Sequence, residues 1–246
     1  SASVLRRAGS GVDRRACRGA ARALAVAPAL AARLRVDTQV EVHALTLPWS
    51  IPSPISQHER GLARAQLGFD EADRVLLYAG NLDAYQGLDG LAESVRQLAA
   101  ERGNLFLLVA TASDPATCSV LRAPGLPVRF APLSSEADRR LVHAAADLVV
   151  VPRAVPGGVP IKLLDALARG TKVVTTQRAA AGLDLGAACV VVADDDPAVF
   201  AQACAALLGS GPVELGHAAR AYVESAHVPS DFVAQFVDLG LRAHSF

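Results

Sequence analysis

The sequence lacks methionine altogether and has no long apolar run. Its longest apolar stretches, such as residues 187–193, are the length of a strand and fall far short of the ~20 residues that a membrane-spanning helix requires. No signal-peptide pattern opens the chain either. We therefore expect no segment that crosses a bilayer, and the missing initiator methionine indicates that these 246 residues begin inside a longer gene product.

The chain also lacks an excess of either charge and any cysteine pair at metal-ligand spacing. Its 24 basic and 24 acidic side chains cancel, so no overall field favours nucleic acid or an anionic surface as the main partner, and any anion site must be local. Four scattered cysteines and six isolated histidines argue against a zinc site or a disulfide framework and favour a reducing cytosol. Their spacing assigns none of the histidines a role.

Short apolar runs alternate with helical patterns between residues 75 and 206, in a chain that is 52% hydrophobic and 20% charged. The runs are apolar on both faces, as the central strands of a parallel sheet are, and the alternation is typical of a sheet covered by helices. The predicted strands cover residues 75–79, 105–110, 128–131, 148–151, 172–176 and 189–193. We therefore predict an α/β fold, a Rossmann-like doubly wound parallel sheet of about six strands, whose ligand lies at the carboxyl ends of the strands.

The rest of the chain divides around a proline-rich segment. Residues 15–35 form an Ala-rich pattern typical of one helix, followed by a strand-like stretch over residues 40–45. Three prolines within residues 47–56 disfavour regular structure and indicate a crossing between domains. Two terminal helices are predicted over residues 213–225 and 231–242. The predicted organisation is a remnant of a preceding domain over residues 1–46, a linker and entry segment over residues 47–73, and a Rossmann-like domain with the terminal helices over residues 74–246.

Two loops after predicted strands carry residues suited to an anion. In the first loop, Gly80, Asn81, Gln86 and Gly87 lie between a strand and a predicted helix. Glycine allows close backbone approach, and the N-terminus of a helix offers unpaired N–H groups to a phosphate. A tight turn without a ligand is the alternative interpretation.

The second loop contains Arg153 and two glycines ahead of a helix predicted over residues 161–169. By their spacing, Lys162, Asp165 and Arg169 share one face of that helix. The residues predicted to face the sheet are Ile161, Leu164 and Ala168. Arg153 and Lys162 would neutralise a diphosphate, while Asp165 would accept hydrogen bonds from ribose hydroxyls. The alternative is a surface ion pair between Asp165 and Arg169 beside a solvated Lys162.

Three stretches of the sequence carry a family resemblance. They are residues 76–81 with the Gly87-Leu88 pair, residues 145–153, and above all residues 158–170. Together they resemble glycosyltransferase family 4, whose signature helix is similar to the last stretch. The resemblance implies a two-domain GT-B fold, in which the C-terminal half binds a nucleotide sugar and the N-terminal half contacts the acceptor. This chain would be the C-terminal half, with residues 1–46 as a remnant of the acceptor domain.

The resemblance also implies roles for individual residues. Arg153 and Lys162 would be catalytic and would stabilise the departing nucleoside diphosphate without a metal or another cofactor. The donor-binding residues would be Gly80, Asn81, Gln86, Gly87, Gly157, Gly158, Val159, Pro160, Leu163 and Asp165. Asp165 and Gly157 stand where the family usually has glutamates, and Asn81 and Gln86 stand where many members carry arginine and lysine. Arg153 and Lys162 would have to compensate for those two missing cations.

The resemblance implies a retaining transfer of a hexose from a nucleoside diphosphate sugar to a saccharide or lipid-linked acceptor, in polysaccharide or glycolipid synthesis. The enzyme would act in the cytoplasm, with the missing domain in contact with the inner face of the membrane, and the isolated fragment would be inactive. The departures from the family pattern leave two alternatives open. One is a catalytically degenerate GT-B domain that binds only a nucleotide or a protein partner. The other is an enzyme that epimerises the sugar.

Overall fold

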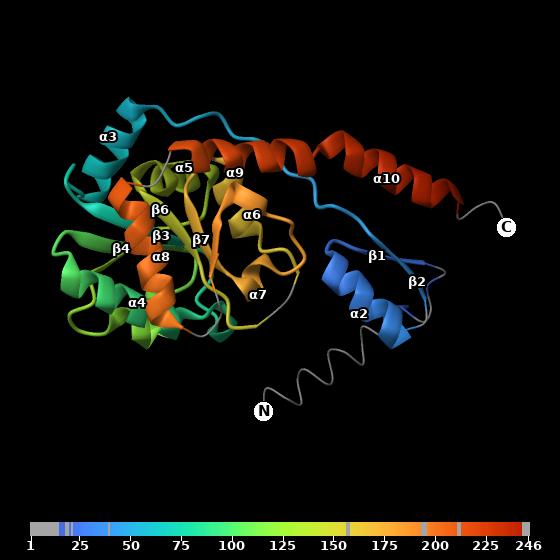
Figure 1. The fold of residues 1–246 in the computed structure, drawn as a ribbon, viewed down its shortest axis with the longest axis horizontal. Helices are drawn as coiled ribbons and strands as arrows, with labels where there is room; N and C mark the ends of the chain where they lie inside the picture. The colour runs from blue at the N-terminus through green and yellow to red at the C-terminus, as the bar shows by residue number, and fades with distance from the viewer. Residues whose placement is uncertain are drawn as a thin grey trace.

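Six parallel strands form the central sheet of the molecule (Figure 1). The computed structural model describes residues 15–17, 20, 22–38, 40–155, 158–192, 196–210 and 213–242. The strands are β3 (Arg74–Ala79), β4 (Leu105–Thr111), β5 (Val128–Pro132), β6 (Leu148–Val151), β7 (Val173–Thr176) and β8 (Val190–Val192). Their order in the sheet is β5-β4-β3-β6-β7-β8, and every neighbouring pair is parallel.

These strands form a central sheet because their side chains are apolar on both faces. Residues 75–78 of β3 are fully buried, and every residue of β6 and β7 is buried. The predicted α/β fold is confirmed, and each observed strand end lies within one residue of the predicted one, although residue 193 is outside the described residues. Because β6 follows β5 in the chain but lies on the other side of β3, a crevice opens at the carboxyl ends of β3 and β6.

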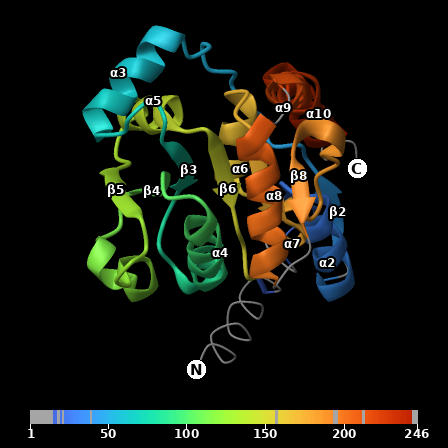
Figure 2. The same cartoon turned by 60° about the vertical axis from the view of Figure 1, so that its left-hand side comes forward.

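Helices cover both faces of the sheet and bury a separate apolar core on each. On one face, α4 (Leu88–Glu101) and α8 (Pro197–Ser210) pack side by side, as Figure 2 shows. The other face is covered by α3 (Gln57–Leu67), α5 (Glu136–Ala145), α6 (Ile161–Ala168), α7 (Gln177–Ala180) and α9 (Val213–Ala226). The 3-10 helices are η1 (Ala84–Gln86), η2 (Pro115–Thr117), η3 (Ser119–Arg122) and η4 (Gly186–Ala188).

The N-terminal part of the chain is a small β–α–β unit and not one long helix. β1 (Arg22–Ala25) and β2 (Glu41–Ala44) pair in parallel, and α2 (Pro28–Thr38) packs on them. The helix predicted over residues 15–35 is therefore wrong. Pro28 starts a new helix and disfavours helical backbone in the residue before it, while the preceding segment finds a strand partner in β2. The assignment of residues 1–46 to a preceding domain stays a prediction, and residues 1–14, 18–19, 21 and 39 are outside the described residues.

Residues 45–56 connect this unit to the main sheet without helix or strand, as the prolines predict. The chain then forms α3, which lies inside the predicted linker and was not anticipated. A capping box starts α3, because the Ser56 hydroxyl accepts from the Glu59 N–H and the Glu59 carboxylate accepts from the Ser56 N–H. The last helix, α10 (Pro229–Arg242), extends past the β1–β2 pair (Figure 1), where Arg22 Nη1 donates to the Leu239 carbonyl at 3.0 Å. α9 and α10 confirm the two predicted terminal helices.

Candidate functional site

The carboxyl ends of β3 and β6 bring the two predicted anion loops into contact. The Ala154 N–H donates to the Tyr85 carbonyl at 3.0 Å and joins the loops. Gly87 lies at this contact with φ at +75°, and a Cβ there would be 3.3 Å from the backbone nitrogens of Arg153 and Ala154. Only glycine meets both conditions without strain. Gly87 therefore allows the two loops to pack directly against each other at the crevice.

A cavity of about 360 Å³ opens between these loops and the start of α6. The predicted site residues that line it are Gly80, Asn81, Gln86, Arg153, Val159, Pro160 and Lys162. Gly158 lies beside them, because its carbonyl accepts a hydrogen bond from Arg153 Nη1 at 2.9 Å. The structure thus gathers residues from two loops and one helix around a single space. Gly157 falls outside the described residues.

Gly87 and Gly158 lie next to residues of this lining without belonging to it, whereas Leu163 and Asp165 lie away from the cavity. Leu163 is fully buried in the core, and Asp165 is buried on the side of α6 that faces α5. The prediction that Ile161 faces the sheet is wrong, since this side chain is 56% exposed. Ile161 is the first residue of α6, so its side chain projects beyond the edge of the sheet and lines the cavity instead.

Lys162 reaches from α6 to the end of β3. Its Nζ donates to the Tyr78 hydroxyl at 3.1 Å and to Gln86 Oε1 at 2.5 Å, and it lies 4.3 Å from the centre of the Tyr78 ring. Burial, with a smaller contribution from the nearby Arg153 guanidinium, lowers the pKa of Lys162 to about 7. The alternative of a solvated lysine is therefore wrong. The amine is largely buried at the cavity wall, and this burial favours its neutral form.

Arg153 supplies a second cation on the same wall. Its guanidinium carbon lies 5.9 Å from the centre of the Tyr85 ring. Its Nε is buried and has no hydrogen-bond partner among the described residues. None of the described residues that line the cavity is acidic. A cavity with two cations and no described counter-charge favours an anionic ligand.

The two amides in the first loop form a hydrogen-bonded chain that ends at Lys162. Asn81 Nδ2 donates to Asp83 Oδ2 at 2.5 Å and to the Tyr85 hydroxyl at 3.1 Å. Gln86 Nε2 donates to Asn81 Oδ1, which leaves Gln86 Oε1 to accept from Lys162. Asn81 and Gln86 therefore contact the cavity without adding charge to it.

Asp165 belongs to a buried polar cluster between α5 and α6. Its Oδ2 lies 3.3 Å from His143 Nε2, and its Oδ1 lies 3.2 Å from Arg169 Nε. The Nη2 atom of Arg169 also pairs with Glu136 at 2.6 Å. The ion pair that spacing suggested between Asp165 and Arg169 exists, but it is buried and not on the surface. Lys162 and Asp165 thus point to different neighbours although they share one side of the helix by spacing.

The electrostatics of this cluster favour an ionised aspartate beside a neutral histidine. Burial opposes the charge of Asp165, but the hydrogen bond with His143 and the pairing with Arg169 lower the pKa of its carboxyl overall. Burial lowers the pKa of His143. Sequence analysis assigned no role to His143, because nothing local to it reveals that its partner lies on the next helix.

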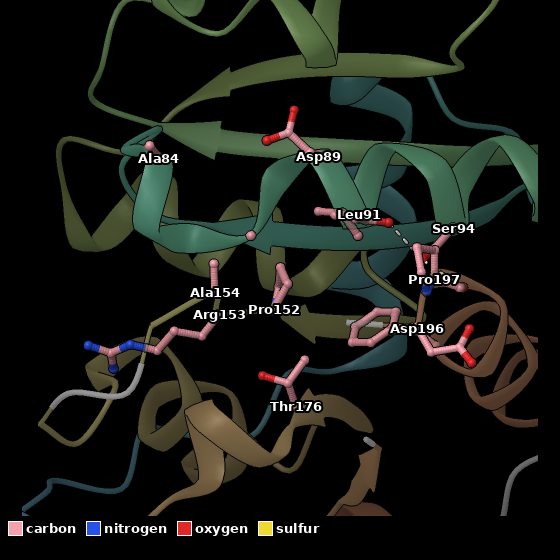
Figure 3. A pocket seen from close by; sticks show the side chains of 13 residues that line it. Ala84, Asp89, Leu91, Ser94, Pro152, Arg153, Ala154, Thr176, Asp196 and Pro197 are labelled. Atoms are coloured by element: carbon pink, nitrogen blue, oxygen red, sulfur yellow. Dashed lines mark hydrogen bonds between the residues drawn. The ribbon is translucent and has the colours of Figure 1, made fainter. Parts of the chain in front are cut away.

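A second cavity of about 320 Å³, whose lining includes Gly87, lies at the starts of α4 and α8 (Figure 3). Its lining includes the acidic residues Asp89 and Asp196. Figure 3 shows the Arg153 guanidinium directed away from Asp196. Two carboxylates repel a diphosphate, so the cavity between Gly80 and Lys162 is the better anion site.

Over the part of the chain that the structure describes, no group of three or more His, Cys, Asp or Glu side chains is arranged to hold a metal ion. Within the same residues, no helix meets the length and hydrophobicity that a membrane span needs.

Comparison with known families identifies a matching family model. The family model described as Glycosyl transferases group 1 matches residues 73–210, which is more than half of the chain. No curated protein sequence matches the chain. The matched segment begins just before β3 and ends with α8, so it contains the sheet, both anion loops and α6.

Three solved structures illustrate the fold likeness. Sucrose-phosphate synthase from Thermosynechococcus elongatus has 19% identity and a TM-score of 0.79, and the match covers 95% of this chain and 61% of that one. WaaG, a glycosyltransferase involved in lipopolysaccharide biosynthesis, has 21% identity and a TM-score of 0.71, with 85% and 60% covered. Anabaena HepE in complex with UDP-glucose has 16% identity and a TM-score of 0.83, with 97% and 69% covered. The likeness confirms the predicted Rossmann-like half of a GT-B fold.

Proposed function

The chain belongs to the group 1 glycosyl transferases, and we propose that it is the donor-binding part of a family 4 glycosyltransferase that retains anomeric configuration without a metal. The donor would be a nucleoside diphosphate hexose, and the acceptor a saccharide or lipid-linked saccharide in polysaccharide or glycolipid synthesis. The observation that carries this proposal is the pair of cations, Arg153 and Lys162, on a cavity at the carboxyl ends of β3 and β6 whose described lining has no carboxylate.

In the proposed reaction, the bond between the anomeric carbon and the diphosphate oxygen breaks, and negative charge grows on the leaving diphosphate. Fixed cations next to that charge stabilise the transition state more than the ground state. Lys162 and Arg153 would supply them, and the N-terminus of α6 would add the partial positive charge of its first N–H groups. Gly80 would allow the diphosphate to approach the backbone.

Asp165 is the proposed ribose ligand, although both of its oxygens already have partners. A ribose hydroxyl would have to share either Oδ2 with His143 or Oδ1 with Arg169. A carboxylate oxygen has two lone pairs, so it can accept two hydrogen bonds. The proposal therefore needs the ribose to reach the α5 side of α6.

The neighbouring structures support a UDP-sugar as the first donor to test, because HepE was solved with UDP-glucose. The chain spans 61% of the sucrose-phosphate synthase that it resembles, so we place acceptor binding, with any contact to the inner membrane face, outside these residues. We expect this chain to bind donor without turning it over. Its four cysteines are free thiols, which supports the proposed cytoplasmic location.

Titration calorimetry and thermal shift with UDP, GDP, ADP and TDP test the proposal. One nucleotide should bind and stabilise the chain, and the effect should disappear in Lys162→Ala. The matched control is Lys172→Ala. Lys172 precedes β7 and therefore lies at the amino ends of the strands, away from the cavity, where its Nζ donates to the Leu207 carbonyl. If no nucleotide binds to the folded chain, or if both lysine variants lose binding equally, the proposed donor site is wrong.

A catalytically degenerate GT-B domain is the second candidate. The neutral amides Asn81 and Gln86 line the cavity where the family resemblance leads one to expect cations. Sugar-donor hydrolysis by the longer protein distinguishes the two functions. Binding of a nucleoside diphosphate without release of nucleotide from any sugar donor would favour the degenerate domain.

A further inference from the structure

The end of the Lys162 side chain is fixed by residues that come from β3 and the loop after it. Its Nζ contacts the Tyr78 hydroxyl at 3.1 Å and Gln86 Oε1 at 2.5 Å. A Cβ on Gly80 would be only 3.2 Å from the same nitrogen. Lysine is a point charge on a flexible four-carbon stem, so these contacts select one of many possible positions for the amine.

The two acceptors are themselves oriented by hydrogen bonds. Tyr78 donates its single hydroxyl proton to the Asn81 carbonyl at 2.6 Å, so the phenol oxygen can only accept from Lys162. Asp83 is an acceptor, which requires Asn81 to present its NH₂ group to Asp83 and its oxygen to Gln86. Gln86 must then present its oxygen to Lys162. The orientation of both side-chain amides therefore follows from the Asp83 carboxylate, and that of the Tyr78 hydroxyl follows from the Asn81 backbone carbonyl.

This arrangement leaves part of the ammonium available to a ligand. A protonated lysine has three N–H donors, and Tyr78 and Gln86 accept two of them. The third can donate to a phosphate oxygen in the cavity. Both acceptors are neutral at neutral pH, so they fix the ammonium without cancelling its charge.

We infer that Tyr78 and Gln86 are positioning residues for nucleoside diphosphate binding, and that they hold the Lys162 amine at the cavity wall. Gln86 is oriented through Asn81 by the Asp83 carboxylate, and Tyr78 by the Asn81 backbone carbonyl. The inference rests on the proposed function, adds Tyr78 to the site, and gives Gln86 a positioning role that does not require contact with the ligand. It also implies that the cation can be moved from position 162 to position 86 without leaving the cavity wall. Because Lys162 and Gln86 meet across the contact between helix and loop, a lysine on either side would face the same cavity.

Exchange of the two side chains tests this directly, with UDP as the probe in titration calorimetry. Lys162→Gln should lose roughly tenfold or more in affinity, as expected when a charged hydrogen bond is lost. The double variant with Lys162→Gln and Gln86→Lys should regain most of that loss, because the new lysine has acceptors in Asn81 and in the introduced glutamine. A lysine with a purely structural role would give no such recovery.

Single removals of the acceptors test the positioning itself. Gln86→Leu and Tyr78→Phe should each weaken UDP binding by roughly tenfold, and neither should weaken it further in a Lys162→Gln background. The matched controls are Gln97→Leu on α4, where Gln97 bonds Glu93, and Tyr222→Phe on α9, where Tyr222 faces His227. Circular dichroism and thermal unfolding would show that each variant is folded.

The outcomes separate this inference from the proposed function. If wild type binds UDP and Lys162→Gln does not, but both acceptor variants bind like their controls, the positioning role is wrong and the donor site stands. Failure of the exchange variant to recover, together with unaffected acceptor variants, would lead to the same conclusion. If wild type binds none of UDP, GDP, ADP, TDP and inorganic pyrophosphate, the proposed function is wrong and the inference falls with it.

Discussion

Binding of a nucleoside diphosphate should weaken steeply as the pH rises from 7 to 9. Burial and the neighbouring Arg153 lower the pKa of Lys162 to about 7, so the amine loses its charge within this range. An anion in the cavity stabilises the charged form, which raises the pKa of Lys162 in the complex. Binding therefore takes up a proton, and the free-energy cost of protonating Lys162 rises with the pH.

The size of the effect follows from the fraction of charged amine. With a pKa of about 7, roughly half of the Lys162 amines are charged at pH 7 and about 1% at pH 9. If only the charged form binds, affinity falls roughly 50-fold, or ~2.3 kcal/mol. The diphosphate contributes little to this change, because its last ionisation lies near pH 6. Burial raises the pKa of Tyr78, the phenol in contact with the amine, so it keeps its proton throughout.

Calorimetric titration of UDP at pH 7, 8 and 9, in buffers with different ionisation enthalpies, measures both the affinity and the number of protons taken up. Lys162→Arg is the decisive variant, because a guanidinium stays charged over this range. It should bind with little pH dependence, while Lys172→Met should keep the wild-type profile. A flat wild-type profile, or an equally steep one in Lys162→Arg, would refute the reasoning.

Three further predictions concern stability and are measured by urea unfolding. Lys162 should add up to about 1.4 kcal/mol per pH unit above pH 7 to the free energy of unfolding, because the unfolded chain holds its proton more tightly than the folded chain, and the difference in slope between wild type and Lys162→Met measures this contribution. Gly87→Ala should cost about 1–3 kcal/mol because of its φ of +75° and the backbone 3.3 Å from the added methyl group, whereas Gly90→Ala, with open space around it, should not destabilise. Asp165→Asn should cost about 2 kcal/mol, because it removes the charged partner of Arg169 Nε and leaves that buried guanidinium paired with Glu136 alone, and an unchanged midpoint would mean that the pair is solvated.

The sheet could be predicted from the sequence because its strands are apolar on both faces, a pattern that few other elements share. The first helix could not. Residues 22–25 are Ala-rich and suit a helix locally, but they pair with residues 41–44, and no local feature reveals such a partner. α3 shows the opposite case. Its capping box, Ser56 with Glu59, is visible in the sequence, but the prolines just before it suggested an irregular segment throughout.

The sequence predicted most residues of the candidate site but not their hydrogen-bond partners. Spacing correctly placed Lys162 on the helix after the second loop, and both loops meet at one cavity. It could not show that Lys162 bonds Gln86, 76 residues earlier, or that Asp165 bonds His143 on the neighbouring helix. Helical periodicity defines a face only to within about a quarter of a turn, and packing of neighbouring elements decides where each side chain on it points.

The neutral amides at positions 81 and 86 fit a working anion site better than their lack of charge suggests. Lys162 already has Arg153 as a neighbour, and that guanidinium helps lower its pKa. A second cation at position 86, in contact with the same Nζ, would lower the pKa of Lys162 further and favour its neutral form at pH 7. Gln86→Lys alone should therefore bind UDP no better than wild type, although it carries one more cation at the cavity. The exchange variant keeps a single cation at this contact. Markedly tighter binding by Gln86→Lys would show instead that total charge, and not the position of one ammonium, limits the affinity.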